Sequence, residues 1–232
     1  MNNVIFLNLS QNKISIIVYD KDNQKQVFNE DFEAEGLLSN NLILQNKLNN
    51  ILKDQVLHIE NKMNISISTI HLMIDDPKIF TIKISTKKNY EKNQIKKKEI
   101  EYLIQDLKQQ ISFSSKDLKI LHIVAENFVL DGIQTETIPI NDYCNDLVIE
   151  VKFICIKKHF VELVRDIFKK YQIDLELVIS TEYALSQTPI TSKGLLEAGL
   201  CIINRSNHKE VFILPKKTTK LGFFERIFHI FS

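Results

Sequence analysis

The sequence predicts an α/β fold made of mixed sheets, in which helices pack on both antiparallel and parallel strands. The first two apolar runs, Val4–Leu9 and Ile14–Tyr19, are separated by a short polar turn, which is typical of antiparallel strands. Beyond them, further short apolar runs alternate with segments whose apolar residues recur at helical spacing. This alternation favours helices packed on sheets. At 232 residues, the chain has the length of one average-to-large domain or two small ones.

The first part of the chain is predicted to form one helix on one sheet. A third, weaker strand follows the first two, and a helix is expected from about Asn40 to Lys62, with Ser39 as its cap. Its apolar residues recur at helical spacing and are Leu44, Leu48, Ile51, Leu52 and Val56. The segment Ile67–Asp75 is then expected to be a strand.

A second unit is predicted to begin after Asp75-Asp76-Pro77. Its expected elements, in chain order, are a strand at 78–85, a helix at 93–111, a strand at 118–133 that turns at Asp131-Gly132, a strand at 147–158 and an amphipathic helix at 158–172. The chain then returns to shorter elements. These are a strand at 173–180, a helical turn at 181–187, and strands at 199–206 and 210–217.

The last residues, LGFFERIFHIFS, concentrate large apolar side chains on one half of a helical wheel. The segment is shorter than the roughly 20 residues needed to span a bilayer, and lysines precede it. We therefore expect it to lie on an anionic membrane surface as an amphipathic helix. The residues expected to bind the membrane are Leu221, Phe223, Phe224, Arg226, Ile227, Phe228, Ile230, Phe231, Lys216, Lys217 and Lys220. The alternative is a final helix that packs into the chain's own core.

Composition excludes several classes of function. The net charge of +1 gives no bulk attraction to nucleic acid, and the basic run Lys96–Lys98 is neutralised by neighbouring glutamates. The six histidines and three cysteines have no metal-ligand spacing, and no catalytic arrangement can be proposed from their order. The N-terminus lacks the basic region of a signal peptide. We expect a non-enzymatic protein in a reducing, cytoplasmic compartment.

The segment from Leu118 to Gln187 resembles FtsA, a bacterial cell-division family of actin-like proteins that ties the division ring to the cytoplasmic membrane. Three elements carry the resemblance in the family's order: Phe128, Leu130, Asp131 and Gly132; then Glu150, Val151, Phe153 and Ile154; then Ile173, Leu175, Leu177, Val178 and Ala184. Upstream, Gly36 and the strand from Ser68 to Ile74 match the family's first subdomain. The terminal amphipathic helix is also what that family uses to bind membrane.

The resemblance implies a partial actin-like, ribonuclease H-like fold with an inserted strand-helix-strand subdomain. The implied division of the chain is 1–76 plus 173–215 for the partial actin-like subdomain, 77–172 for the inserted subdomain, and 216–232 for the basic linker and membrane-binding helix. On this resemblance, we expect the chain to lack the second half of the fold, which in the family supplies the adenosine side of the cleft and the surface that receives the tail of FtsZ.

Actin-like proteins hold nucleotide phosphates in two loops of the type Asp-Ile-Gly, because the aspartate organises metal-bound water and glycines let backbone N–H groups approach the phosphates. The corresponding segments here are Asn8–Lys13 and Asn204–Lys209. Asparagine replaces the aspartate in both, and no glycine remains in either. We therefore regard Asn8, Ser10, Asn204 and Ser206 as marking degenerate phosphate loops, and expect no ATP, no other cofactor, no metal and no catalytic residue.

The resemblance also implies a function and partners. We expect a scaffold on the inner face of the cytoplasmic membrane that recruits other division proteins, with FtsZ and further copies of the chain as candidate partners of the inserted subdomain. Three alternatives stay open: an actin-like ATP-binding protein with divergent loops, a relative that acts in pilus assembly, and a decaying remnant with no partner.

Overall fold

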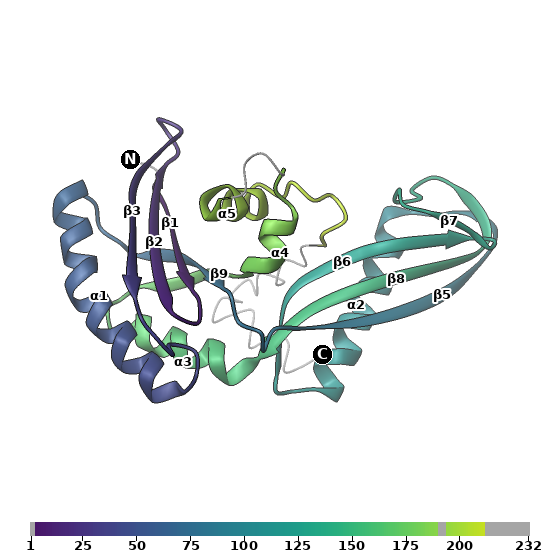
Figure 1. Ribbon diagram of the computed structural model, residues 1–232. Helices are drawn as coiled ribbons and strands as arrows, with labels where there is room; N and C mark the ends of the chain where they lie inside the picture. Colours follow the sequence, from purple (N-terminus) through teal and green to yellow (C-terminus); the bar gives the residue numbers. More distant parts are fainter. Residues whose placement is uncertain (1–2, 190–193, 212–232) are drawn as a thin grey trace, which may run out of the picture.

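The computed structural model describes residues 3–189 and 194–211 and has the predicted mixed α/β architecture, with two separate sheets. The first sheet carries helices on both of its faces, and the second sheet projects away from it as an elongated unit with one helix along it (Figure 1). The second sheet is formed entirely by the segment between β4 and α3, so it is an insertion into the first unit.

The first sheet has five strands in the order β3-β2-β1-β4-β9. Their bounds are β1 Asn3–Leu9, β2 Lys13–Asp20, β3 Lys25–Glu33, β4 Thr69–Ile74 and β9 Asp174–Ser180. The first three strands form an antiparallel meander, whereas β4 runs parallel to β1, and β9 runs parallel to β4. The alternating pleat sends Ile5, Leu7 and Leu9 to one face of the sheet and Val4 and Phe6 to the other.

Helices cover both faces of this sheet because both faces are apolar. Helices α1 (Asn41–Met63) and α3 (Lys158–Lys169) pack on one face, and α4 (Thr181–Ser186) and α5 (Leu195–Ile203) lie on the other (Figure 1). Asn40 caps the N-terminus of helix α1, because its side-chain oxygen accepts hydrogen bonds from Leu42 N and Ile43 N. The predicted cap, Ser39, instead donates to the carbonyl of Gly36.

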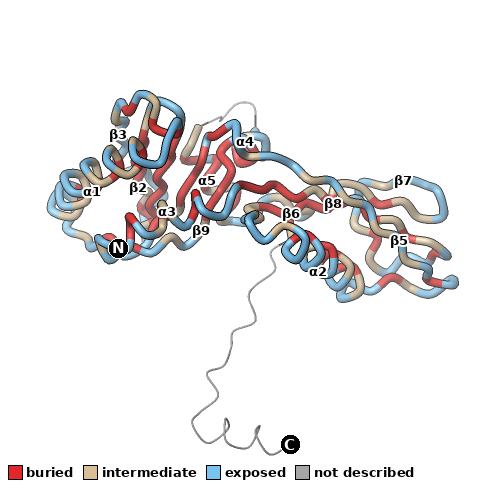
Figure 2. The backbone as a smooth tube through the Cα atoms, turned by 90° about the horizontal axis from the view of Figure 1, so that it is seen from below, coloured by how far each residue is buried: buried red, intermediate tan, exposed pale blue. Residues whose placement is uncertain are grey.

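The second sheet has four strands in the order β5-β8-β6-β7, and each pair of neighbouring strands within it is antiparallel. Its elements are β5 Phe80–Gln94, α2 Lys97–Ser114, β6 Leu118–Leu130, β7 Ile133–Thr135 and β8 Tyr143–Lys157. Helix α2 buries Ile100, Ile104, Leu107 and Ile111 against one face of the sheet. Buried residues follow the strands along the whole length of this unit (Figure 2).

The structure overturns one predicted strand. Residues 199–206 were expected to be extended, but Leu195–Ile203 is helix α5, and a turn follows it. The apolar residues on which the strand was based continue a helical pattern that begins earlier, at Leu196 and Ala198. The strand predicted at 210–217 is described only at its start, where Glu210 forms an isolated antiparallel bridge with Val124.

Candidate functional site

Three parallel strands of the first sheet, β1, β4 and β9, end at the same edge. Ligands of open α/β sheets bind outside the carboxyl ends of such strands, so this edge is the first place to look for a site. Asn8 lies at the end of β1, Asp75 and Asp76 follow β4, and Ser180 and Thr181 follow the apolar part of β9. The carboxyl edge therefore gathers polar side chains from segments that are far apart in sequence.

The first predicted loop lies at this edge as the tight β1–β2 hairpin. Within it, Ser10 closes the turn, because both its N–H and its hydroxyl donate to the carbonyl of Lys13, at 2.9 and 3.0 Å. Asn8 is buried, and its side-chain oxygen accepts a 2.7 Å hydrogen bond from the hydroxyl of Thr181, which is also buried. The side chain that stands where the aspartate was expected is thus hydrogen-bonded to the protein itself.

The second predicted loop is built differently from the expectation. Asn204 caps the end of helix α5 and forms a turn with Arg205, whose backbone is left-handed with φ of 55°, and Ser206 follows the turn. The chain then pairs with β6, because Ala125 N donates to Lys209 O and Val211 N donates to Ile123 O. Asn204 and Ser206 therefore do not lie in a strand-turn-strand loop.

A buried polar network lies where the inserted unit meets the first sheet. His122, on β6, has its Nδ1 2.6 Å from Glu210 Oε1, and the two side chains are 1% and 3% exposed. The other carboxylate oxygen of Glu210 accepts from the Tyr183 hydroxyl at 3.0 Å, and Asn207 donates to that hydroxyl. Three segments distant in sequence thus share one set of hydrogen bonds.

The protonation of this network follows from its donors. The backbone N–H of Ser180 donates to Nε2 of His122 at 2.9 Å, so that nitrogen carries no proton. The imidazole is therefore neutral, and its Nδ1–H donates to Glu210. Burial, together with the neighbouring Glu210 carboxylate, raises the pKa of the Tyr183 phenol, which keeps that group protonated as a donor. Each atom of the network has a partner, as buried polar groups require.

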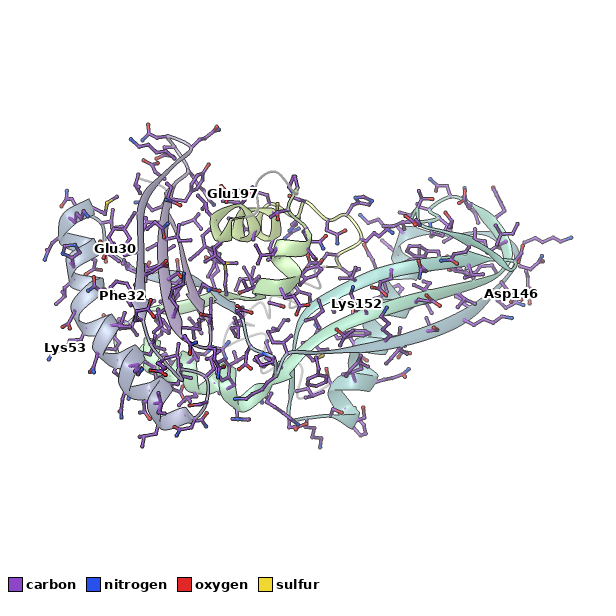
Figure 3. The ribbon with its side chains drawn as sticks, in the orientation of Figure 1. Glu30, Phe32, Lys53, Asp146, Lys152 and Glu197 are labelled. Carbon is purple, nitrogen blue, oxygen red and sulfur yellow. The ribbon has the colours of Figure 1, made fainter. Side chains whose placement is uncertain are left out.

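A groove runs beside this network, between the open face of the inserted sheet and the start of α4. It encloses about 270 Å³ and is lined by Ile79, Thr81, Lys152, Ile154, Ser180, Glu182, Tyr183 and Ser186. Figure 3 places Lys152 on the part of the inserted sheet near this junction, and its Nζ lies 2.5 Å from Glu126 Oε1. The hydroxyl of Ser186 donates to the carbonyl of Tyr183, so this serine is not paired with a base.

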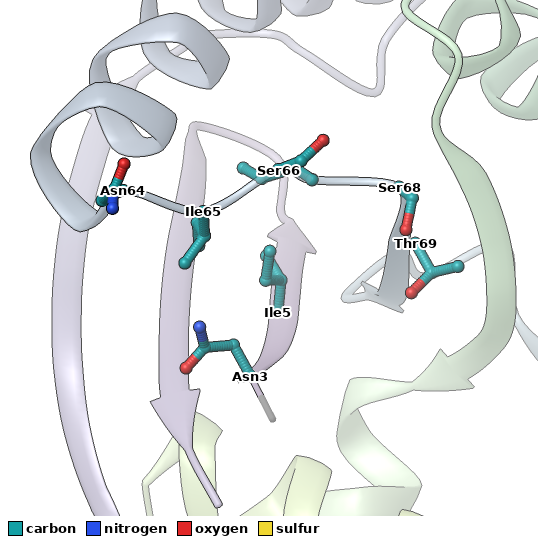
Figure 4. A pocket seen from close by; sticks show the side chains of 8 residues that line it. Asn3, Ile5, Asn64, Ile65, Ser66, Ser68 and Thr69 are labelled. Atoms are coloured by element: carbon teal, nitrogen blue, oxygen red, sulfur yellow. The ribbon is translucent and has the colours of Figure 1, made fainter. Parts of the chain in front are cut away.

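A larger cavity of about 520 Å³ lies at the opposite end of the sheet, beside the start of β1 (Figure 4). Its lining consists of Asn3, Ile5, Asn64, Ile65, Ser66, Ile67, Ser68 and Thr69. All eight residues are uncharged, and none of these side chains titrates near neutral pH. The lining supplies no acid, base or metal-binding carboxylate, so the carboxyl edge remains the stronger candidate.

Several predicted residues lie outside the part of the chain that the structure describes. They are the predicted membrane-binding residues Leu221, Phe223, Phe224, Arg226, Ile227, Phe228, Ile230, Phe231, Lys216, Lys217 and Lys220. Among residues 3–189 and 194–211, no helix is long and apolar enough to cross a membrane. The same residues contain no group of three or more histidine, cysteine or acidic side chains that could hold a metal ion.

The strand order of the first sheet, with a second sheet inserted after β4, is consistent with a partial actin-like fold. Neither a protein-family model nor a curated protein matches the sequence. Some solved structures do resemble it. One of them is a protein from Bacteroides thetaiotaomicron with an actin-like ATPase fold and unknown function. That match has a TM-score of 0.33 and 14% identity, and covers 79% of this chain and 53% of the other.

Two further similar structures come from a secretion system and a pilus biogenesis complex. One is the cytoplasmic domain of EpsL, an inner-membrane component of the type II secretion system of Vibrio cholerae, with a TM-score of 0.37, 11% identity, and coverage of 79% of this chain and 58% of the other. The other is a PilM–PilN type IV pilus biogenesis complex, with a TM-score of 0.49, 10% identity, and coverage of 79% and 49%. The chain thus spans about half the length of the structures it matches. Likenesses this distant name neither a family nor an activity.

Proposed function

We propose that this protein is a non-enzymatic scaffold of actin-like plan that recruits other proteins at a membrane surface. The observation that carries the proposal is the closed carboxyl edge of the first sheet. There, Asn8 and Thr181 are buried and hydrogen-bonded to each other at 2.7 Å, at the position where an actin-like site would hold phosphate.

The chemistry of this edge opposes nucleotide hydrolysis for two reasons. An asparagine at position 8 lacks the negative charge that would organise metal-bound water. The β1–β2 hairpin has side chains at Ser10, Gln11 and Asn12 where glycines would let backbone N–H groups approach a triphosphate. Both features support a protein that keeps the fold of a nucleotide-binding unit without its chemistry.

The inserted unit supports a recruiting role. It projects from the first sheet and presents one largely polar face that α2 does not cover (Figure 1). Division proteins, or further copies of this chain, would bind this unit in an FtsA-like scaffold, and residues 216–232 would hold the complex on the inner face of the cytoplasmic membrane. The FtsA-like role in cell division is the more specific form of the proposal.

The nucleotide part of the proposal is tested by equilibrium dialysis of the full chain against ATP with Mg²⁺. We expect no saturable binding. Tight binding would instead support the second candidate, an actin-like ATP-binding protein of division or pilus assembly with divergent loops. A fluorescent fusion in the native cells separates division from pilus assembly, because a division scaffold gathers at midcell and a pilus platform at a pole.

The membrane part is tested by sedimentation with anionic vesicles. Replacing Phe224 and Phe228 with glutamate places charge on the apolar face of the predicted helix and is expected to release the protein. His229→Glu with Ser232→Glu adds the same charge to the polar face and is the matched control, expected to retain more binding. Equal sedimentation of the first variant and the parent would contradict membrane attachment through this helix.

A further inference from the structure

Strand β5 forms an open edge of the inserted sheet. It is the first strand in the order β5-β8-β6-β7, and it pairs with β8 without a register shift from Phe80 to Asn89. The opposite edge is covered, because β7 pairs with the end of β6, and the segment Lys209–Val211 pairs with its middle. Within residues 3–189 and 194–211, no backbone group pairs with the outer side of β5 over this stretch.

The hydrogen bonds of β8 show which residues of β5 point their backbone groups outward. In an antiparallel strand, the N–H and C=O of one residue face the same side, and the side alternates along the chain. The carbonyl of Asp146 accepts a hydrogen bond from Asp131 N, so the backbone N–H and C=O of Asp146 point toward β6. Asn89 is the register partner of Asp146 on β5, and its backbone groups therefore point away from β8. By alternation, the outward-facing residues are Thr81, Lys83, Ser85, Lys87 and Asn89.

The two outward-facing lysines, Lys83 and Lys87, do not cover the edge, because each forms an ion pair with a carboxylate on β6 or β8. Lys83 Nζ lies 2.7 Å from Glu126, and Lys87 Nζ lies 2.9 Å from Asp146, yet their side chains remain 68% and 62% exposed. Glu126 also pairs with Lys152, so two lysines share this carboxylate, and Glu150 is a further acidic group close to Lys83. Because these lysines are held in ion pairs on the sheet, the unpaired backbone groups of the edge stay accessible, and such an edge can pair with an added strand.

The other face of the same strand is apolar at Ile82 and Ile84, and Thr86 and Lys88 follow on that face. Ile82 and Ile84 are partly buried against the core beneath α2, and their outer flank borders the open edge. A strand added here would meet lysines on one face and isoleucines on the other. The side chains of an added strand point alternately to the two faces, since the side-chain period of a strand is two residues. A partner strand that alternates acidic and apolar residues would therefore place the acidic ones beside the lysines and the apolar ones beside the isoleucines.

We propose that the outer edge of β5 binds an extended segment of a partner protein in which acidic residues alternate with apolar ones. Charge complementarity selects this occupant over a second copy of the chain. An antiparallel copy of β5 would bring lysines 83 and 87 next to, or diagonal to, the same lysines of its neighbour, and like charges at these positions are destabilising. An acidic partner strand instead places carboxylates beside these lysines, and opposite charges at cross-strand positions are stabilising.

The test uses the full chain and a synthetic peptide of alternating glutamate and valine, as long as Thr81–Asn89. Binding is measured by fluorescence anisotropy at low and high salt. Ser85→Pro removes one outward N–H without breaking a bond to β8, and Pro is tolerated at edge strands. We expect it to weaken binding at least tenfold, whereas the matched Ser85→Ala, which keeps that N–H, changes binding less than threefold.

Two further measurements use altered peptides with the parent protein, so they do not depend on whether the proline variant folds. A peptide of alternating lysine and valine is expected not to bind. Of two peptides N-methylated at either every valine or every glutamate, at least one is expected to bind tenfold more weakly. Unchanged binding by both methylated peptides would overturn the proposal.

Two other results would also overturn it. In the first, β5 would act as a dimer interface: the parent would form a dimer in sedimentation, and Ser85→Pro would dissociate it. In the second, it would act as a membrane site: Lys83→Gln with Lys87→Gln would lower binding to anionic vesicles while peptide binding stayed unchanged.

Discussion

Asn8 and Thr181 show at the scale of single residues how a phosphate position can be closed. The two side chains lie on segments far apart in sequence, and each is buried. Thr181→Ala would leave the Asn8 side-chain oxygen buried without this donor, and an unsatisfied buried polar group costs about 1–3 kcal/mol. We expect a loss of that size in the free energy of unfolding, measured with urea.

The matched control for this prediction is Thr181→Ser, which keeps the hydroxyl and removes only a methyl group. It is expected to cost less than Thr181→Ala, since the hydrogen bond to Asn8 can still form. If both variants lost the same stability, the methyl packing and not the hydrogen bond would explain the effect.

His71 gives a pH dependence whose sign can be worked out. Its side chain is 12% exposed and lies on the ring of Phe6, with ring centroids 5.4 Å apart. Burial lowers the pKa of His71 below its ordinary value of 6.5, and the nearby Glu176 only partly opposes this effect. The unfolded state therefore binds the proton more readily, so stability is lost as the pH falls below about 6.5.

We predict that His71→Gln makes this loss of stability less steep. The measurement is the urea midpoint of parent and variant between pH 7 and pH 5, where the difference between the two curves isolates this side chain. A variant whose midpoint fell as steeply as that of the parent would show that His71 does not contribute to the acid sensitivity.

The sequence pattern predicted Asn8 as a position in the first phosphate loop, but it did not predict the buried network around Glu210. A position before a hairpin can be recognised because the residues that matter are adjacent in the chain. His122 and Glu210 are 88 residues apart, and nothing in the local sequence of either one marks the pair. Their partnership arises from the fold, which pairs the segment after α5 with β6.

At the scale of elements, periodicity predicted the helices and strands that carry a strong apolar pattern. Helices α1, α2 and α3 and strands β1, β2, β4, β6 and β9 lie close to their predicted positions, and the ends differ by a few residues. The three-residue strand β7 is too short to show a pattern of its own. Helix α5 was mistaken for a strand because a short apolar run does not distinguish the two.

Helix α5 depends on a close contact that only glycine permits. A Cβ atom built on Gly199 would lie 2.5 Å from the ring of Phe6, which is fully buried. Gly199→Ala should therefore destabilise the protein by about 1–3 kcal/mol, the usual cost of overpacking a core, although alanine favours a helix by about 1 kcal/mol. Thermal unfolding followed by circular dichroism measures the change.

Gly194→Ala, at the N-cap of α5, is the natural comparison. A Cβ at Gly194 would meet only the carboxylate end of Glu197, a flexible side chain that can move away. We expect this substitution to cost less than Gly199→Ala. The reverse order would contradict the packing of α5 against β1.

At the scale of the whole molecule, the buried network joins three parts of the chain. His122 belongs to the inserted sheet, Tyr183 and Ser180 belong to α4 and the strand before it, and Glu210 belongs to the segment after α5. That last segment leads directly into the predicted linker and membrane-binding helix. The position of the inserted unit relative to the rest of the protein is therefore tied to the last described segment of the chain.

This coupling can be measured by a double-mutant cycle with His122→Ala and Glu210→Ala. Each single change leaves a buried partner without its hydrogen bond, so the two losses should not add, and residues that share one network couple by about 0.5–3 kcal/mol. The exposed pair Lys87 and Asp146, at the far end of the inserted sheet, is the comparison and should couple by about 1 kcal/mol or less.

Hydrogen exchange gives a second readout, since Glu210→Ala should raise exchange at the amides of Ala125 and Val211, which hold the last segment on β6. If the two losses were additive and these amides stayed protected, the network would not be what holds the inserted unit and the last described segment together.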